Sequence, residues 1–240
     1  MTPELERQLR DAGLDRTIEA SFPASDPPST GPNPIVDTKA GFTGGALMTT
    51  YTVGYLVGSL AKASLNRKLA GALVRLAPRQ LTMTEIPFRD LPIYSYDYDA
   101  DYPAVATQFK EAIAAVDAVL FVTPEYNRSI PGGLKNAIDW ASRPYGTNAF
   151  TRKPSAIIGA SPGRIGTAVA QQHLRSILAY CNSPLMNSME AYIQLEKGSI
   201  TDDGEITNES TRKFLAKFMS ELHGFIERVY TVLPRPEADQ

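Results

Sequence analysis

The sequence predicts an α/β fold, a doubly wound five-stranded parallel sheet of strand order 2-1-3-4-5 with helices on both faces. Short β-branched or aromatic runs alternate along the chain with longer segments in which apolar residues recur at helical spacing. The run at 118–122 is apolar throughout, which is typical of a strand buried on both faces. Polar or glycine-rich loops follow the first, third and fourth strands. Those strands are neighbours in this order, so the three loops should meet in one crevice.

Composition and charge narrow the class of protein. The 240 residues carry a net charge of −2 and are 43% hydrophobic, as is ordinary for a globular protein with a sizeable core. This balance gives no reason to expect a nucleic acid or a membrane surface as a partner. No stretch approaches the roughly 20 apolar residues of a membrane span, and the N-terminus lacks an apolar signal region. Cys181 is the one cysteine, so no intrachain disulfide can form, and we expect a cytoplasmic protein.

The first part of the chain differs in composition from the rest. Six of the eighteen prolines lie within the first 34 residues, and such a segment neither propagates a helix nor pairs as a central strand. We therefore expect residues 1–47 to form an extended or disordered arm and residues 48–240 to form the folded domain. An arm that lies across a neighbouring subunit is the alternative.

The first strand is expected at 51–57, and it runs into a Gly/Ser loop that opens a helix at Leu65. Amide groups at a helix start are unpaired, and the helix dipole favours negative charge there, so the loop is a candidate phosphate site. Ser59, Ser64 and Asn66 would add side-chain donors at the same place. The alternative is that Ser64 is only an N-cap worth ~1 kcal/mol. The loop has neither a Walker sequence nor a GxGxxG fingerprint.

The remaining elements follow the same alternation. The long loop after the second strand contains several tyrosines and aspartates, which suit a solvated surface. The last helix should bury one apolar stripe made of Phe214, Phe218, Leu222, Phe225 and Val229. The expected strands are 81–86, 117–122, 153–160 and 185–193, and the expected helices are 103–116, one opening after Pro131, 167–180 and 208–232.

Two further loops at the carboxyl ends of strands carry candidate ligand contacts. The loop after the third strand is rich in hydrogen-bonding groups, with Glu125, Tyr126 and Asn127 in a row. The loop after the fourth strand contains Ser161 and Gly163, and a glycine lets the backbone approach a flat ring closely because it has no Cβ.

Other kinds of site find little support in the sequence. His173 and His223 are the only histidines, and neither has a Cys or His partner at metal-ligand spacing. A G-x-S-x-G elbow is missing, which argues against a serine hydrolase. Cys181 follows a helix in an apolar setting, so we interpret it as a buried core thiol. His173 fits a surface position better than a catalytic one. The site therefore needs no protein acid or nucleophile.

The stretch TPEYNRSIPGGLKNAIDW at 123–140 resembles the signature of the NADPH-dependent FMN reductase family, which includes flavin, quinone, azo-dye and chromate reductases. The loop GSLAKASLN at 58–66 is similar to that family's FMN-phosphate loop, usually GSLRxxSxN. Our sequence has Ala61 where many relatives carry Arg, which removes one cation near the phosphate. Lys62 or Arg67 would be the candidates to replace it.

The resemblance runs from about residue 51 to residue 232 and implies a flavodoxin-like fold that binds FMN, with NADPH or NADH as co-substrate. The protein would pass hydride from nicotinamide to the flavin and then electrons to a flavin, quinone, azo or chromate-type acceptor. The flavin carries the chemistry, so no catalytic side chain and no metal are implied. Arg128 would meet the phosphates of the nicotinamide nucleotide, and a homodimer or homotetramer is expected. The residues expected to hold FMN are Ser59, Ser64, Leu65, Asn66, Pro124, Glu125, Tyr126, Asn127, Ser161 and Gly163.

Two other functions remain open from the sequence. A flavodoxin-like electron carrier would dock a protein partner, but such carriers are usually strongly acidic, and a net charge of −2 argues against one. A flavin-binding sensor or scaffold without turnover would use its N-terminal arm to contact a partner.

Overall fold

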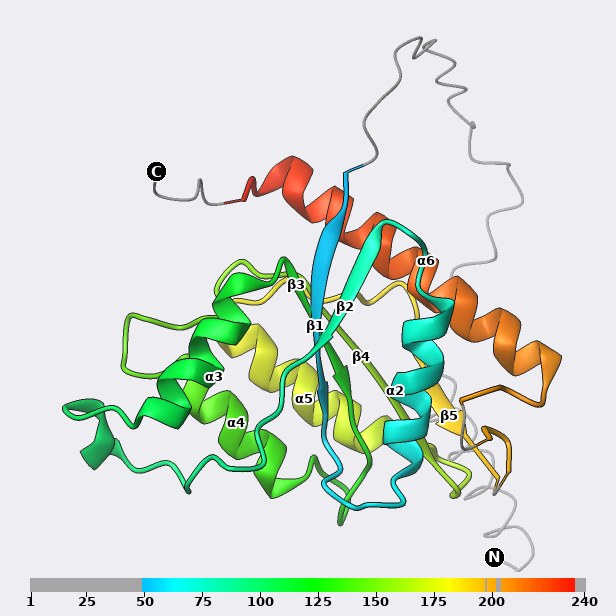
Figure 1. Ribbon diagram of the computed structural model, residues 1–240, viewed down its shortest axis with the longest axis horizontal. Coiled ribbons are helices and arrows are strands. Elements are labelled where there is room, and N and C mark those ends of the chain that lie inside the picture. The colour runs from blue at the N-terminus through cyan, green and yellow to red at the C-terminus, as the bar shows by residue number, and fades with distance from the viewer. Residues whose placement is uncertain (1–48, 197, 202–203, 236–240) are drawn as a thin grey trace, which may run out of the picture. The chain divides into compact units, whose positions relative to one another are not determined.

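One parallel sheet organises the part of the chain that the structure, a computed structural model, describes: residues 49–235 apart from 197 and 202–203 (Figure 1). Its strand order is β2-β1-β3-β4-β5, which confirms the predicted order 2-1-3-4-5. All neighbouring strands pair in parallel. The predicted arm at 1–47 lies outside the described residues. The strands are β1 (Tyr51–Val57), β2 (Leu81–Glu85), β3 (Ala118–Val122), β4 (Ser155–Ser161) and β5 (Tyr192–Gln194).

Helices cover both faces of the sheet, so the fold is flavodoxin-like, as the sequence predicted (Figure 1). On one face lie α3 (Ala104–Ala115), α4 (Gly132–Ser142) and α5 (Ala168–Tyr180). On the other face lie α2 (Leu65–Leu76) and α6 (Glu209–Val232). A short 3₁₀ helix, η1 (Tyr96–Asp99), interrupts the tyrosine-rich loop before α3.

The central strand β3 separates the two cores. Its side chains alternate between them, with Phe121 packed among the residues of α3, α4 and α5 and Leu120 among those of α2 and α6. No residue of β3 is more than 1% exposed. A strand that is apolar at every position suits this place, because both of its faces are covered. The polar loop after β3 is therefore held at the edge of a rigid element.

Two predicted details were wrong. The strand expected at 185–193 is only three residues long, because the chain leaves the sheet after Met186, whose N–H still bonds to the Ser155 carbonyl, at 2.9 Å. Exposed Asn187 and Ser188 interrupt the pairing there. In α6 the buried face is rotated from the predicted stripe, and Phe214, Phe225 and Val229 are only partly buried because they lie at its margin. The residues that α6 buries are Leu215, Phe218, Met219, Leu222 and Ile226.

Candidate functional site

The loops after β1, β3 and β4 meet at the carboxyl edge of the sheet, as predicted. Ser59, only 4% exposed in the loop after β1, lies with its hydroxyl oxygen 3.4 Å from the phenol oxygen of Tyr126 in the loop after β3. The loops after β3 and β4 flank one cleft of about 640 Å³. We call it the edge cleft; it is lined by Glu125, Asn127, Arg128, Ser161, Gly163, Arg164, Ile165 and Gly166.

The loop after β1 combines hydroxyl groups with a helix start. Ser64 is the N-cap of α2, and its side-chain oxygen accepts a hydrogen bond from the Arg67 amide at 3.2 Å. This cap uses a lone pair of the hydroxyl and leaves its hydrogen available to a ligand. The amides of Leu65 and Asn66 belong to the first helical turn, where backbone N–H groups have no intrahelical acceptor. Capping and anion binding are therefore compatible at this loop.

Asn66 connects two of the three loops, the one after β1 and the one after β4. Its side-chain amide donates to the Ala160 carbonyl and accepts from the Ala160 amide, both at 2.9 Å, and the residue is 3% exposed. This bridge ties the start of α2 to the end of β4. The sequence suggested Asn66 as a phosphate donor, but the bridge occupies its oxygen and one N–H, so its evident task is to position the loop.

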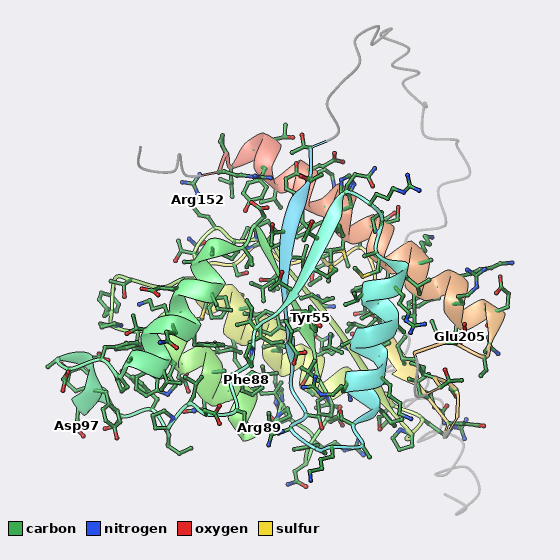
Figure 2. All side chains as sticks on the ribbon, viewed as in Figure 1. Tyr55, Phe88, Arg89, Asp97, Arg152 and Glu205 are labelled. Atoms are coloured by element: carbon green, nitrogen blue, oxygen red, sulfur yellow. The ribbon has the colours of Figure 1, made fainter. Side chains whose placement is uncertain are left out.

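A guanidinium group from a different strand end lies close to the loop that contains Ala61. Arg67 points elsewhere, because it pairs with the Glu85 carboxylate at 3.0 Å. Arg89, which follows β2 and is labelled in Figure 2, donates to the Leu60 carbonyl at 2.7 Å, so its guanidinium group lies next to the peptide that joins Leu60 to Ala61. Sequence reasoning missed Arg89 because no spacing rule relates it to the loop after β1. Of the two predicted substitutes, Lys62 lies exposed within that loop.

Glu125 holds the loop after β3 against α5. One oxygen of its carboxylate accepts from the amides of Val169 and Ala170, at 3.0 and 3.1 Å. The other oxygen accepts from Arg128 at 3.1 Å, and the Glu125 side chain is only 8% exposed. Thr167, the N-cap residue of α5, makes no side-chain cap bond. Glu125 is therefore the cap of α5, supplied by a remote loop.

A tight two-residue turn presents the tip of the same loop. Backbone bonds of 2.9 and 3.0 Å join Tyr126 and Ser129, and the residues between them, Asn127 and Arg128, have φ of 50° and 64°. Positive φ is unusual for residues other than glycine, and a two-residue turn of this kind requires it at both central positions. Exposed His173 on α5 supports the turn through its Nδ1, 3.1 Å from the Ser129 hydroxyl. His173 thus occupies a surface position, as predicted.

The loop after β4 forms the opposite wall of the edge cleft. The Gly166 amide donates to the Gly163 carbonyl at 3.0 Å, which closes a turn with exposed Arg164 at one of its corners. Gly166 has a φ of +62°, and a Cβ there would lie 2.8 Å from the carbonyl carbon of Tyr192. The amide of Gly163 also donates to the Ser161 hydroxyl at 3.1 Å. These hydrogen bonds and the close approach of Gly166 to Tyr192 hold the loop after β4 in one conformation.

The donor set fits the FMN that the sequence predicts. At one end are the buried hydroxyls of Ser59 and Ser64, the start of α2 and the guanidinium of Arg89, all suited to a phosphate. Beside them is the half-exposed ring of Tyr126, whose phenol oxygen lies 3.4 Å from the Ser59 hydroxyl. In the loop after β4, a Cβ on Gly163 would meet only the Ser161 hydroxyl, at 3.5 Å, and both Tyr126 and Gly163 suit a flat ring. Pro124 is buried directly after β3 and sets where the loop begins.

Groups outside this site bear on the other functions considered. Cys181 is 4% exposed among the residues of α3, α4 and α5, and burial raises the pKa of its thiol, so it is a core residue as predicted. Among the described residues, no group of histidine, cysteine, aspartate and glutamate side chains could hold a metal ion. No helix in the described part of the chain is long and apolar enough to cross a bilayer.

Comparison with known proteins agrees with this geometry. Residues 51–197 match the family described as NADPH-dependent FMN reductase. The chain is 49% identical over 174 residues to 2-hydroxy-1,4-benzoquinone reductase from a Burkholderia species, covering 72% of this chain and 95% of that protein. It is 46% identical over 178 residues to a quinone reductase from Pseudomonas putida, covering 74% and 95%. The solved structure of FerB, a flavoenzyme NAD(P)H:(acceptor) oxidoreductase from Paracoccus denitrificans, is 46% identical with a TM-score of 0.72, covering 75% of this chain and 98% of that one.

Proposed function

The chain belongs to the NADPH-dependent FMN reductase family, and from this premise we propose that it is a quinone reductase whose FMN lies across the three loops at the carboxyl edge of the sheet. As a member it is a flavin-dependent oxidoreductase that uses NAD(P)H. Quinone is the acceptor we favour, because relatives at 46–49% identity are named for quinone reduction. The observation that carries the placement of FMN is the meeting of Ser59 with Tyr126, which brings the phosphate loop and the ring-binding loop together.

In this proposal the FMN phosphate lies at the start of α2. The hydroxyls of Ser59 and Ser64 and the amide of Leu65 donate to its oxygens, while Asn66 holds the loop in place. Arg89 supplies the positive charge. A phosphomonoester carries nearly two negative charges at neutral pH, so a guanidinium group beside the loop strengthens binding.

The flavin ring lies toward the edge cleft. Pro124, Glu125, Tyr126 and Asn127 run along the ribityl chain and the ring, and the loop after β4 borders the ring edge through Ser161 and Gly163. When bound, FMN accepts hydride from the nicotinamide and delivers electrons to the acceptor, so the protein need supply no acid or nucleophile. The side chains bind the cofactor, orient it and leave one face open to the two substrates in turn.

Arg128 lies where it can meet the phosphates of the nicotinamide nucleotide. Its side chain is 65% exposed at the corner of the turn after β3, and the pair with Glu125 fixes its direction. Guanidinium groups bind phosphate with two parallel hydrogen bonds. This contact would orient either nucleotide, because both contain a pyrophosphate.

Self-association as a homodimer or homotetramer is also part of the proposal. Large apolar side chains stand exposed on the loop after β2 and near the end of α4, with Ile93 at 80%, Tyr96 at 79% and Tyr145 at 87%. A second copy of the chain would remove them from water. The cytoplasm is the compartment we propose, since it supplies the reduced nicotinamide nucleotide.

The decisive experiment is an anaerobic stopped-flow measurement on protein reconstituted with FMN. We expect NADPH or NADH to bleach the flavin absorbance and a quinone to restore it. Ser59→Ala and Tyr126→Phe should each weaken FMN binding by about tenfold, the equivalent of ~1.4 kcal/mol, while Ser176→Ala on the exposed side of α5 should not. Tight FMN binding without reduction by either nucleotide would reject the reductase. FMN affinity unchanged in both site variants would reject the placement of the cofactor.

A further inference from the structure

We propose that Arg164 makes the edge cleft an anion-recognition site that selects acceptors carrying a negative charge. The class of acceptor is a quinone with an ionised substituent, such as a ring hydroxyl or a carboxylate. This inference rests on the proposed function and adds to it a specificity-determining residue, Arg164, which sequence motifs do not single out.

Both arginines are presented in the same way. Arg128 stands at a corner of the turn closed by the backbone bonds between Tyr126 and Ser129, and Arg164 stands at a corner of the turn closed by the Gly166 amide and the Gly163 carbonyl. The two turns follow different strands, β3 and β4, yet residues of both line the one cleft of about 640 Å³. The guanidinium groups therefore approach the same space from opposite walls.

The charges that line the cleft are unbalanced. They comprise one carboxylate, that of Glu125, and the guanidinium groups of Arg128 and Arg164. The carboxylate is nearly buried and is already satisfied by three N–H donors, one of them from Arg128. Arg164 is exposed and makes no ion pair or hydrogen bond with the residues that the structure describes. Its charge is the one available to a substrate.

The position of Arg164 favours the acceptor over the nucleotide as its partner. Arg164 directly follows Gly163, which borders the flavin ring in the proposed site. A quinone is a single ring that must lie over the flavin to be reduced, so a substituent on it comes within reach of this turn. The 2′-phosphate that distinguishes NADPH from NADH belongs to the adenosine ribose, at the far end of the dinucleotide from the nicotinamide.

The chemistry of the acceptor fits a guanidinium group. A hydroxyl on a quinone ring is a vinylogous carboxylic acid, so it ionises readily and shares its charge between two oxygens, as a carboxylate does. A guanidinium fork can meet the charged oxygen on C2 together with the adjacent carbonyl oxygen on C1, or the two oxygens of a carboxylate substituent. The reaction balances as for any quinone: NAD(P)H supplies two electrons and one proton, solvent supplies the second proton, and the products are the oxidised nucleotide and the hydroquinone. A carboxylate substituent keeps its charge throughout, whereas an ionised ring hydroxyl takes up one further proton from solvent, because the hydroquinone is no longer a vinylogous acid.

The test compares two quinones of similar size in the oxidative half-reaction alone. The FMN-loaded protein is photoreduced without nucleotide and mixed anaerobically with 2-hydroxy-1,4-benzoquinone, which is anionic, or with 2-methoxy-1,4-benzoquinone, which is neutral. Arg164→Gln should slow reoxidation by the anionic quinone about tenfold and leave the neutral one within about twofold. Arg164→Lys should fall between wild type and Arg164→Gln. The control is Arg152→Gln, at an exposed arginine before β4, at the opposite edge of the sheet from Arg89 (Figure 2).

A binding measurement without turnover provides the second arm. Calorimetry on the oxidised, FMN-loaded protein should show that benzoate binds more tightly than neutral benzamide, and that Arg164→Gln removes the difference. Equal losses for both quinones, or a benzoate affinity that does not change in the variant, would overturn the proposal. A change confined to the ratio of NADPH to NADH in the reductive half-reaction would overturn it in favour of the nucleotide phosphate. If neither quinone reoxidises the wild type, the quinone reductase assignment fails, and the benzoate comparison alone decides whether Arg164 recognises anions.

Discussion

Replacing Glu125 with alanine should release the loop after β3 from α5. The Glu125 carboxylate accepts from the amides of Val169 and Ala170 at 3.0 and 3.1 Å, and the cap residue Thr167 offers no side-chain bond in its place. In Glu125→Ala both amides at the start of α5 lose their acceptor, in a place that water reaches poorly because the Glu125 side chain is 8% exposed. The variant thus removes a helix cap and a tie between two elements at once.

The size of the effect follows from these contacts. Losing an N-cap costs about 1 kcal/mol, and a hydrogen bond to a charged group contributes roughly 1.5–3 kcal/mol, so we expect the free energy of unfolding to fall by about 2–4 kcal/mol. The exposed pair with Arg128 adds little, at most about 1 kcal/mol. Glu125→Gln keeps an oxygen that accepts from the α5 amides and should lose only about 1 kcal/mol. For a domain of this size, the alanine variant should melt roughly 5–15 °C lower.

Urea unfolding of the FMN-free protein checks this estimate, since bound cofactor would add its own binding free energy to the measured stability. The matched control is Glu111→Ala, at an exposed glutamate on α3, which should change stability by less than about 0.5 kcal/mol. Equal stability of Glu125→Ala and Glu111→Ala would refute the assignment of Glu125 as the cap of α5. A Glu125→Gln variant as unstable as Glu125→Ala would show that the charge, and not the accepting oxygen, holds the loop.

Three further predictions concern Arg89, Asn66 and Tyr102. Arg89→Ala should raise the dissociation constant of FMN about tenfold, and Arg89→Lys should raise it less, as measured by flavin fluorescence. An unchanged dissociation constant would mean that Arg89 only donates to the Leu60 carbonyl and does not bind the cofactor. Asn66→Ala leaves a buried amide and carbonyl of Ala160 unpaired and should lose about 2–4 kcal/mol in urea unfolding, whereas a loss below about 1 kcal/mol would contradict the bridge. Burial, followed by the negative charge of Asp99, raises the pKa of Tyr102 to about 12, so its contribution to stability is complete below the ordinary pKa of 10.0 and is lost as the pH rises towards 12. The stability difference between wild type and Tyr102→Phe should narrow over that pH range, and a constant difference would contradict the raised pKa.

The predicted order of the sheet was confirmed because it depends on local patterns. The apolar run of β3 and the helical spacing in α2 are properties of short segments, and parallel strands joined by helices allow few arrangements. The errors lie where tertiary contacts outweigh local preference. In α6 the sequence offers aromatic residues on two adjacent faces, and packing against the sheet buries Met219 and Ile226 while leaving Phe225 at the margin.

The sequence by itself determined which loops would carry the site, because loops at the carboxyl ends of neighbouring parallel strands must lie together. Only the tertiary structure decided what each side chain does there. The contacts that assign those tasks join residues 29, 44 and 94 positions apart: Arg89 with Leu60, Glu125 with Val169, and Asn66 with Ala160. A hydrogen bond acts over about 3 Å, and no periodicity within one segment reports which distant group will come that close.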